Sequence, residues 1–164
     1  MKRLHFSFTV ILCLTVLLAF PMSGKCATPT AKFPYISFER VAIGDIQPNS
    51  TTDYVRSVYG EPDEITNRRG TKFYSEGEPD EVWTYGKTFS ISFANGKVYS
   101  VISEGNNGLT TPDDIKVGDS ETKVISVYGQ RGKLGYWYRS DNSCNLTISV
   151  KNGKVTRIFA GWDL

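Results

Sequence analysis

The chain has 164 residues, which is the length of one domain or two small ones. It carries 19 basic and 17 acidic side chains, but Lys2, Arg3 and Lys25 lie in an N-terminal segment that we expect to be removed. The remaining chain has a net charge of −1. A near-neutral chain has no electrostatic footprint for nucleic acid, so we expect no nucleic-acid partner.

The first element of the chain has the order of a targeting segment. Basic Lys2 and Arg3 precede an apolar run over residues 6–20, which is too short to span a bilayer as a helix, and a break of small residues follows. This order predicts a signal peptide over residues 1–27, with an uncleaved anchor as the alternative. We therefore expect an extracytoplasmic protein, which is periplasmic, held in the cell envelope or secreted.

The cleavage point and the cysteines leave alternatives open. Cleavage is expected between Gly24 and Ala27. Lipidation of Cys26 would give a membrane attachment after removal of the transient signal peptide, but Lys25 stands where a lipoprotein signal needs a small residue. If Cys26 leaves with the signal, Cys144 has no intramolecular partner. If it stays, a disulfide bond between the two is allowed but supported by no spacing rule.

A short phrase then occurs twice. The tetrapeptide Ser-Val-Tyr-Gly stands at residues 57–60 and again at residues 126–129, and each copy ends a segment with the apolar spacing of a helix. Gly60 and Gly129 are expected to end these helices in the left-handed conformation. The spacing before the two copies is identical over residues 46–60 and 115–129, which indicates an internal repeat.

Polar residues at the start of each segment can cap these helices. Asn49 or Ser50 is expected to accept a hydrogen bond from the first turn of the first helix. In the second copy, residues 118–120 (Gly-Asp-Ser) hold the same place. A capped start and a glycine stop in both copies favour two short helices of the same kind.

Two hairpins are predicted further along the chain. Asn95-Gly96 and Asn152-Gly153 are strong signals for a tight turn between antiparallel strands. A two-residue turn and a three-residue bulged turn place Tyr99 on opposite faces, and the sequence leaves this choice open. The flanking segments alternate between apolar and polar residues, and strands are expected over residues 89–93, 98–102, 146–150 and 155–160.

These elements predict a fold class and domain limits. We expect an α+β protein made of two tandem helix-plus-antiparallel-hairpin repeats, with the helices on one face of the sheet and the other face open. A leader with a candidate edge strand is expected over residues 28–42. The first repeat is then expected over residues 43–105 and the second over residues 106–164.

The repeat resembles a known family. The pattern Gly-x-x-x-x-x-Val-x-x-x-Tyr-Gly over residues 118–129, with Ile-Lys-Val before it and an aromatic strand and Asn-Gly-Lys-Val after it, is similar to the repeat of the beta-lactamase-inhibitor-like superfamily. That superfamily includes secreted beta-lactamase inhibitory proteins and SmpA/OmlA-type outer-membrane assembly lipoproteins. The resemblance covers residues 43–158 and implies helices packed on a sheet whose other face is often concave. The disulfide bonds of the inhibitory proteins have no counterpart here.

Several classes of chemistry are excluded by composition. The single histidine, His5, lies in the predicted signal peptide, so nucleophile activation by imidazole and histidine metal sites are not expected. Carboxylates cluster at Glu76, Glu78, Asp80 and Glu81 and again at residues 113–114, but neither cluster has the spacing of a calcium loop. We expect no catalytic residue, no metal and no cofactor.

Aromatic side chains are the positive functional signal. They concentrate in the predicted strands, and a sheet covered on one side needs only one face of them for its core. We expect the others to form a patch that binds a protein partner. The function expected is therefore that of an exported non-catalytic binding or scaffold module; the alternatives are a secreted enzyme inhibitor and a carboxylate-dependent glycan hydrolase. The candidate face comprises Trp83, Tyr85, Tyr99, Tyr136, Trp137 and Tyr138.

Overall fold

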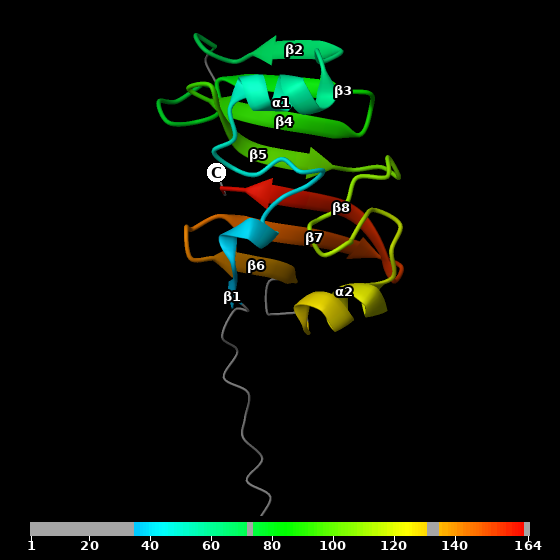
Figure 1. The fold of residues 1–164 in the computed structure, drawn as a ribbon. Coiled ribbons are helices and arrows are strands. Elements are labelled where there is room, and N and C mark those ends of the chain that lie inside the picture. The colour runs from blue at the N-terminus through cyan, green and yellow to red at the C-terminus, as the bar shows by residue number, and fades with distance from the viewer. Residues whose placement is uncertain (1–34, 72–73, 131–134, 163–164) are drawn as a thin grey trace, which may run out of the picture. The chain divides into compact units, whose positions relative to one another are not determined.

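The computed structural model describes residues 35–71, 74–130 and 135–162, so the predicted signal peptide of residues 1–27 lies outside them. Eight β-strands form a single sheet in the order β1-β6-β7-β8-β5-β4-β3-β2 (Figure 1). No helix within the described residues is long and apolar enough to cross a membrane. The strands are β1 (Tyr35–Ile36), β2 (Glu64–Asn67), β3 (Glu81–Tyr85), β4 (Phe89–Ala94), β5 (Lys97–Ser103), β6 (Tyr136–Ser140), β7 (Asn145–Lys151) and β8 (Lys154–Gly161).

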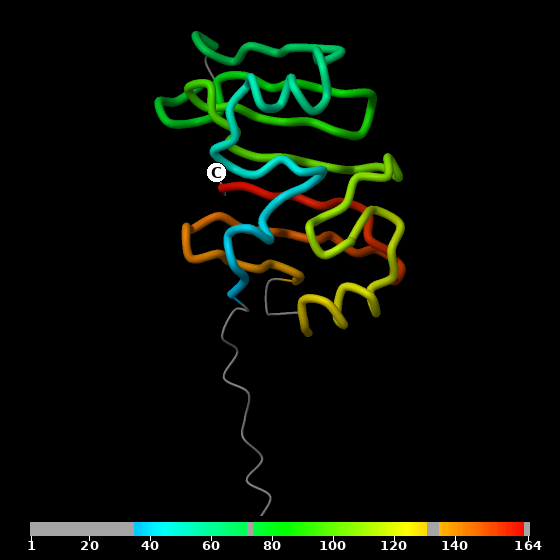
Figure 2. Tube along the Cα trace, viewed as in Figure 1, coloured from blue at the N-terminus to red at the C-terminus, as the bar shows by residue number. Residues whose placement is uncertain are grey.

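The helices are a minor part of this fold. The described residues contain two α-helices of eight residues each, α1 (Thr52–Tyr59) and α2 (Glu121–Tyr128), and one short 3-10 helix, η1 (Phe38–Arg40). The tube in Figure 2 shows that β8, which follows all the other elements in sequence, lies between β5 and β7. The sheet is mixed because β1 runs parallel to β6 while the other neighbours are antiparallel.

The fold class expected from the sequence is wrong. The chain forms one eight-stranded mixed sheet and not two helix-plus-hairpin repeats with helices packed on one face. Pairing of β5 with β8 makes the sheet continuous, with Ser100 opposite Gly161 and Ser103 opposite Ile158. Periodicity is a local property that indicates which side chains are buried, and it carries no information about strands paired across more than fifty residues.

The core explains why the helices are not the main cover of the sheet. Only Val55 of α1, and Val124 and Tyr128 of α2, are buried. The irregular segments before the helices bury more of their side chains than the helices do. The core residues of these segments are Val41, Ile43, Ile46, Ile115 and Val117. They pack with alternate strand residues on what we call the inner face, the side of the sheet that carries Phe89, Ile91, Phe93, Leu146, Ile148, Ile158 and Ala160.

The start of the first helix differs from the expectation by one or two positions, whereas that of the second lies within the expected residues 118–120. The residue that caps α1 is Thr51, whose Oγ1 accepts a hydrogen bond from Tyr54 N at 3.1 Å, and not Asn49 or Ser50. Ser120 caps α2 in the same way, with Lys123 N at 3.2 Å. Asn, Ser and Thr all favour the cap position, so their order within one run does not identify the cap.

The glycine stops have a positive φ, as expected, but a different ψ. Gly60 has φ 74° and ψ −159°, and Gly129 has φ 91° and ψ −176°. This is not the left-handed helical conformation but an extended one that glycine alone adopts freely. The N–H of Gly60 donates to Arg56 O at 2.8 Å, and that of Gly129 to Ile125 O at 2.9 Å.

The hairpins contain both features that the sequence offered as alternatives. Asn95 and Gly96 have φ of 52° and 72°, and they form a two-residue loop between Ala94 and Lys97. Two positive φ values are typical of a type I′ turn. The register then shifts opposite Ser92 and Phe93, so that Tyr99 is an extra residue in a β-bulge. The second hairpin repeats this arrangement, with Thr156 at the bulge.

Candidate functional site

Three of the candidate aromatic residues belong to the core. Trp83, Tyr136 and Tyr138 point to the inner face, with 1%, 5% and 0% of their surface exposed. They therefore cannot be part of an exposed aromatic patch, which corrects the expectation for these positions. The physical reason is strand parity: Trp83 lies opposite the core residue Ile91 on β4, and Tyr138 lies opposite Leu146 on β7.

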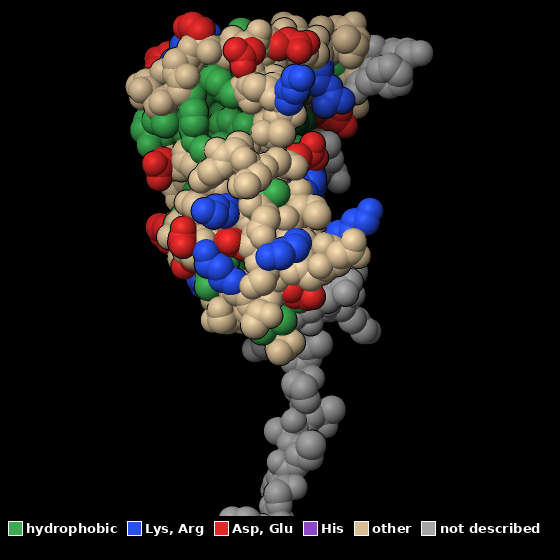
Figure 3. All heavy atoms as spheres, turned by 90° about the vertical axis from the view of Figure 1, so that its right-hand side faces the viewer, with side chains coloured by type: hydrophobic (Ala, Val, Ile, Leu, Met, Phe, Trp, Pro, Cys, Tyr) green, Lys and Arg blue, Asp and Glu red, His purple; other side chains and the backbone are tan. Residues whose placement is uncertain are grey.

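Two further candidates lie at other places on the sheet. Tyr85 is half-buried in a cluster with Tyr59 and Phe89, at ring-centroid distances of 5.5 and 5.8 Å, and its hydroxyl donates to Gly60 O at 3.2 Å. Burial raises the pKa of Tyr85. Figure 3 shows a hydrophobic area on this side of the molecule, where β3 turns into β4. Trp137 is half-buried on β6 and opposes its two neighbours in direction.

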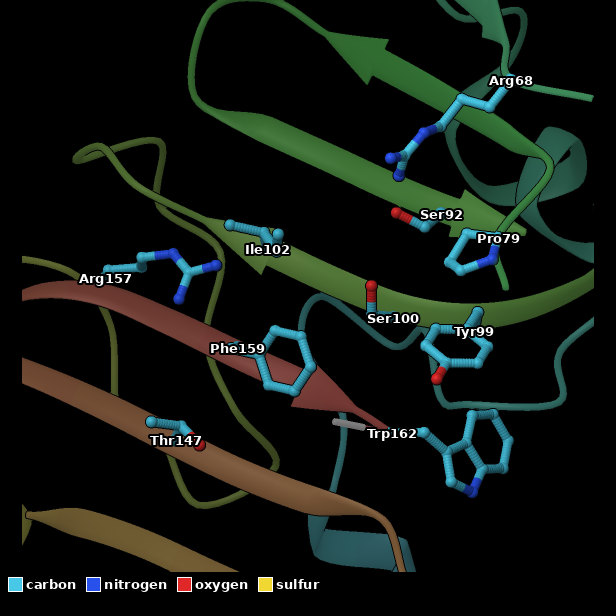
Figure 4. A pocket seen from close by; sticks show the side chains of 10 residues that line it. All are labelled: Arg68, Pro79, Ser92, Tyr99, Ser100, Ile102, Thr147, Arg157, Phe159 and Trp162. Carbon is cyan, nitrogen blue, oxygen red and sulfur yellow. The ribbon is translucent and has the colours of Figure 1, made fainter. Parts of the chain in front are cut away.

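Tyr99 lies beside a hollow on the other side of the sheet, which we call the outer face. The hollow has a volume of about 370 Å³ and is formed by β4, β5, β7 and β8 together with the connection between β2 and β3 (Figure 4). We call it the outer-face hollow. It is lined by Arg68, Pro79, Ser92, Tyr99, Ser100, Ile102, Thr147, Arg157, Phe159 and Trp162.

Small side chains that point outward from the central strands form the floor of this hollow. Ser92, Ser100 and Thr147 are the outward-pointing residues of β4, β5 and β7 at this point, and each carries a small hydroxyl side chain. Larger and more apolar side chains, those of Ile102 and Phe159, lie on either side of the line where β5 pairs with β8. The floor thus combines small hydroxyl side chains with the adjacent apolar side chains of Ile102 and Phe159.

Gly161 allows the close pairing of β5 and β8 under the hollow. A Cβ atom at this position would lie 2.6 Å from both Ser100 Cβ and Tyr99 O, far closer than such atoms approach in proteins. Because Gly161 has no Cβ atom, the two strands lie close together: Trp162 N donates to Tyr99 O at 3.3 Å, and the rings of Tyr99 and Trp162 lie 5.6 Å apart. The bulge and the glycine together place these two aromatic side chains at one edge of the hollow.

The charged residues that line the hollow are both arginines. Arg157 Nε donates to Glu104 Oε1 at 2.9 Å, and its guanidinium lies 5.7 Å from the Phe159 ring centre. Arg68 has no ion pair within the described residues, and its side chain points across the hollow toward Ser92 in Figure 4. Among the described residues, no aspartate or glutamate lines the hollow. Glu104 balances the charge of Arg157, so the positive charge that the described residues bring to the hollow comes from Arg68.

Several of the carboxylates considered for catalysis have structural contacts. Asp80 pairs with Arg69, and Glu81 accepts a hydrogen bond from the Trp83 indole at 2.8 Å. Asp113 forms an ion pair with Arg40 at 2.8 Å.

The neighbouring carboxylates and the titratable groups of the core give no acid–base pair. Asp114 and Asp119 both contact Lys123, at 3.1 and 3.0 Å. Burial would raise the pKa of Asp119, but hydrogen bonds from Lys116 N and Lys123 outweigh it and lower that pKa. Cys144 is a buried free thiol, and burial raises its pKa to about 11. Among residues 35–71, 74–130 and 135–162, no group of three His, Cys, Asp or Glu side chains could hold a metal ion.

The aromatic signal was present in the sequence, but the set differs from the observed one. Phe159 and Trp162 lie on the last strand and just after it, and the candidate face did not include them. The two arginines were missed because Arg68 stands in a connection and Arg157 in a strand of mixed composition, where neither has a local pattern. Only Tyr99 belongs to both the expected face and the hollow.

Comparison with known proteins gives no relative from which a function could be carried over. No family model, no curated protein and no solved structure matches the chain. The function must therefore be inferred from the geometry of the outer face.

Proposed function

We propose that this protein is an exported, non-catalytic binding module that holds a protein partner on the outer face of its sheet. The observation that carries this proposal is the outer-face hollow, where the half-buried rings of Tyr99, Phe159 and Trp162 surround a floor of small polar side chains. The rings of Tyr99 and Phe159 are not part of the core cluster on the inner face, whereas Trp162 also packs against that cluster.

The size and composition of the hollow support a protein partner. A volume of about 370 Å³ is at the small end of the range for ligand sites and is open to one side, so it suits one or two side chains of a larger partner. Binding hot spots are enriched in tryptophan, tyrosine and arginine, and the hollow has all three. The remaining area of contact would come from the outer face around it.

The location in the proposal comes from the N-terminal sequence. Residues 1–27 have the order of a signal peptide, and an envelope or secreted protein meets partners outside the cytoplasm. N-terminal sequencing of the protein from a fractionated cell tests this part alone. A mature start between residues 24 and 28 supports it, whereas an intact Met1 in the cytosolic fraction contradicts it.

Affinity capture with matched variants tests the binding surface. Phe159→Ala is expected to weaken capture of a specific envelope partner by roughly tenfold or more, with little loss of thermal stability, because its side chain lies in the hollow and outside the core cluster. Trp162→Ala is expected to weaken capture as well, with some loss of stability, because Trp162 also packs against the core. Tyr54→Ala is the control, since Tyr54 is a 45% exposed aromatic on α1, outside the hollow. A partner retained equally by all three variants would show that the hollow is not the binding surface.

A further inference from the structure

The arginines of the described chain differ in whether their charge is balanced. Arg40, Arg56, Arg69 and Arg157 each form an ion pair with a carboxylate. Arg139 is exposed and has only a long hydrogen bond, of 3.5 Å, to Ser143. Arg68 is partly buried and has no carboxylate partner among the residues that the structure describes, whereas its neighbour Arg69 has one. Its unbalanced charge faces the outer-face hollow.

Arg157, the second arginine of the hollow, forms an ion pair with which an incoming anion can compete. The ion pair of Arg157 with Glu104 is exposed, with 38% and 58% of the two side chains accessible to solvent. An exposed pair of this kind contributes little stability, so an incoming anion can compete for the guanidinium. Figure 4 shows Arg68 and Arg157 on opposite sides of the hollow, with Ile102 between them and Ser92 and Ser100 to one side.

We propose that the outer-face hollow recognises the carboxylate of an acidic side chain in a polypeptide partner, with Arg68 and Arg157 as its charged contacts and Ser92 and Ser100 as hydroxyl donors. This inference rests on the proposed function. Guanidinium groups present paired N–H donors that match a carboxylate, and hydrogen bonds to a charged acceptor are stronger than neutral ones. None of the described lining residues is a carboxylate, so the ligand competes only with Glu104 for the guanidinium of Arg157.

The walls of the hollow favour a peptide over other anions. Phe159, Trp162 and Ile102 offer apolar surface directly beside the cationic groups, which suits an acidic residue that has apolar neighbours in its own chain. Two arginines on a chain whose predicted mature form has a net charge of −1 are too few for a polyanion such as nucleic acid. The partner segment is therefore acidic at one position and apolar on either side.

Fluorescence anisotropy with two labelled hexapeptides tests the charge requirement. One peptide has a glutamate between phenylalanines, and its twin has glutamine at that place. The wild-type protein is expected to bind the glutamate peptide about tenfold more tightly, because the charged acceptor strengthens its hydrogen bonds. This preference should shrink as salt is raised. Equal binding of the two peptides, or no binding of the glutamate peptide, overturns the inference.

Arginine variants locate the preference in the hollow. Arg68→Gln and the double variant with Arg157→Gln are expected to remove the preference for glutamate while leaving the binding of the glutamine twin unchanged. Arg139→Gln is the matched control, since Arg139 is an exposed arginine on β6 outside the hollow. A preference that survives in the double variant places the carboxylate elsewhere and overturns the inference. Unchanged melting temperatures are required, and Arg68→Lys, which keeps the charge, should retain part of the preference.

Competition separates the sources of the anion and separates this inference from the proposed function. Glutarate, inorganic phosphate and vesicles of anionic phospholipid are added to the peptide complex. Each is expected to displace the peptide only at concentrations far above the dissociation constant of the peptide. Displacement by phosphate or vesicles at low concentration overturns the choice of a peptide carboxylate. If the two peptides bind equally while Phe159→Ala still weakens partner capture, the proposed binding function is supported and only the recognition of a carboxylate is rejected.

Discussion

The two Asn-Gly hairpins have the same backbone and different surroundings. In the first, Val98 N donates to Ser50 O at 2.8 Å; in the second, Val155 N donates to Asp119 O at 2.9 Å, so each hairpin is joined in the same way to the segment that starts its helix. The bulge that follows has Tyr99 in the first hairpin and Thr156 in the second. Local sequence thus sets a common geometry, and the side chain placed on it makes one hairpin part of the outer-face hollow.

The two helix-ending tyrosines show the same contrast. Tyr59 donates from its hydroxyl to a backbone carbonyl, Gly44 O, at 2.6 Å. Tyr128 donates to the side chain of Asp113 at 2.8 Å, and the guanidinium of Arg40 lies 4.6 Å from its ring centre. We call α1 with β2–β5 the first half and α2 with β6–β8 the second half. The same position of the repeat therefore makes a hydrogen bond to a neutral group in the first half and belongs to a cluster of charged side chains in the second.

The largest expected effect tests whether the two halves are one folding unit. Trp83→Ala in the first half and Tyr138→Ala in the second should each lower the free energy of unfolding by about 3–5 kcal/mol, because both truncate fully buried rings. Urea unfolding followed by circular dichroism and by tryptophan fluorescence should give one coincident transition in each variant. Two separate transitions in Tyr138→Ala would show that the halves are independent.

The next effect concerns the glycine stops. Gly60→Val and Gly129→Val should each destabilise the protein by about 1–3 kcal/mol, since valine is strained at a positive φ with an extended ψ. An added Cβ would meet no atom within 4 Å at either site, so the loss is conformational and not steric. Thermal unfolding measures it, with the exposed neighbour Gln130→Val as control. A wild-type melting temperature for Gly129→Val would show that the helix end is wrongly described.

Removing the hydroxyl group is expected to cost more stability at Tyr128 than at Tyr59. Tyr128→Phe should cost about 1–3 kcal/mol, because it removes a hydrogen bond to a charged acceptor and leaves Asp113 with Arg40 alone. Tyr59→Phe should cost about 1 kcal/mol, since its acceptor is a neutral carbonyl. Denaturant unfolding of both variants checks the order. Equal losses would mean that the charge on Asp113 adds nothing to the contact.

A smaller effect is expected at alkaline pH. Burial raises the pKa of Cys144 from 9.0 to about 11 and that of Tyr59 from 10.0 to about 12. The unfolded chain therefore releases these protons first, so the contribution of these two groups to stability is constant below pH 9 and falls as the pH rises through 9–12. Free energies of unfolding measured from pH 8 to pH 11 check this. Cys144→Ala should have a shallower fall between pH 9 and pH 11, and an unchanged slope would exclude the thiol as a cause.

The smallest expected effect is a gain in stability and not a loss. The Tyr138 hydroxyl is buried and has no hydrogen-bond partner within the part of the chain that the structure describes, although its ring lies 5.0 Å from that of Tyr128. Tyr138→Phe removes this unsatisfied group and keeps the ring, so stability should stay the same or rise by up to about 1 kcal/mol. Differential scanning calorimetry beside Tyr128→Phe gives the contrast. A clear loss in Tyr138→Phe would reveal a partner for that hydroxyl.

The sequence predicts local features of this protein well because their causes are local. Asn95-Gly96 and Asn152-Gly153 make tight turns since both residues accept a positive φ, and Gly60 and Gly129 end helices for the same reason. The bulges were left open as one of two alternatives, and the pairing of β5 with β8 was not predicted. They depend on register between distant strands, which residue alternation does not define.

The candidate site was only partly accessible to sequence reasoning. Alternation correctly separates Trp137 from Tyr136 and Tyr138, but it cannot tell which parity faces the core. That choice depends on the side of the sheet on which Ile43, Ile46 and Ile115 lie, and these residues stand in irregular segments. Arg68 and Arg157 meet only through the tertiary fold, so the charge of the hollow has no signature in the chain.

The central position of β8 has a consequence for biosynthesis. A chain made from its N-terminus has β1–β7 available before β8, yet β8 must enter between β5 and β7. Until then β5 and β7 each have an open edge, and the cost of closing the long intervening loops is not yet offset by their contacts. The sheet therefore closes late, when residues 154–161 have left the ribosome. A chain that remains open until its last strand arrives is also one that can be threaded through a membrane pore before it folds.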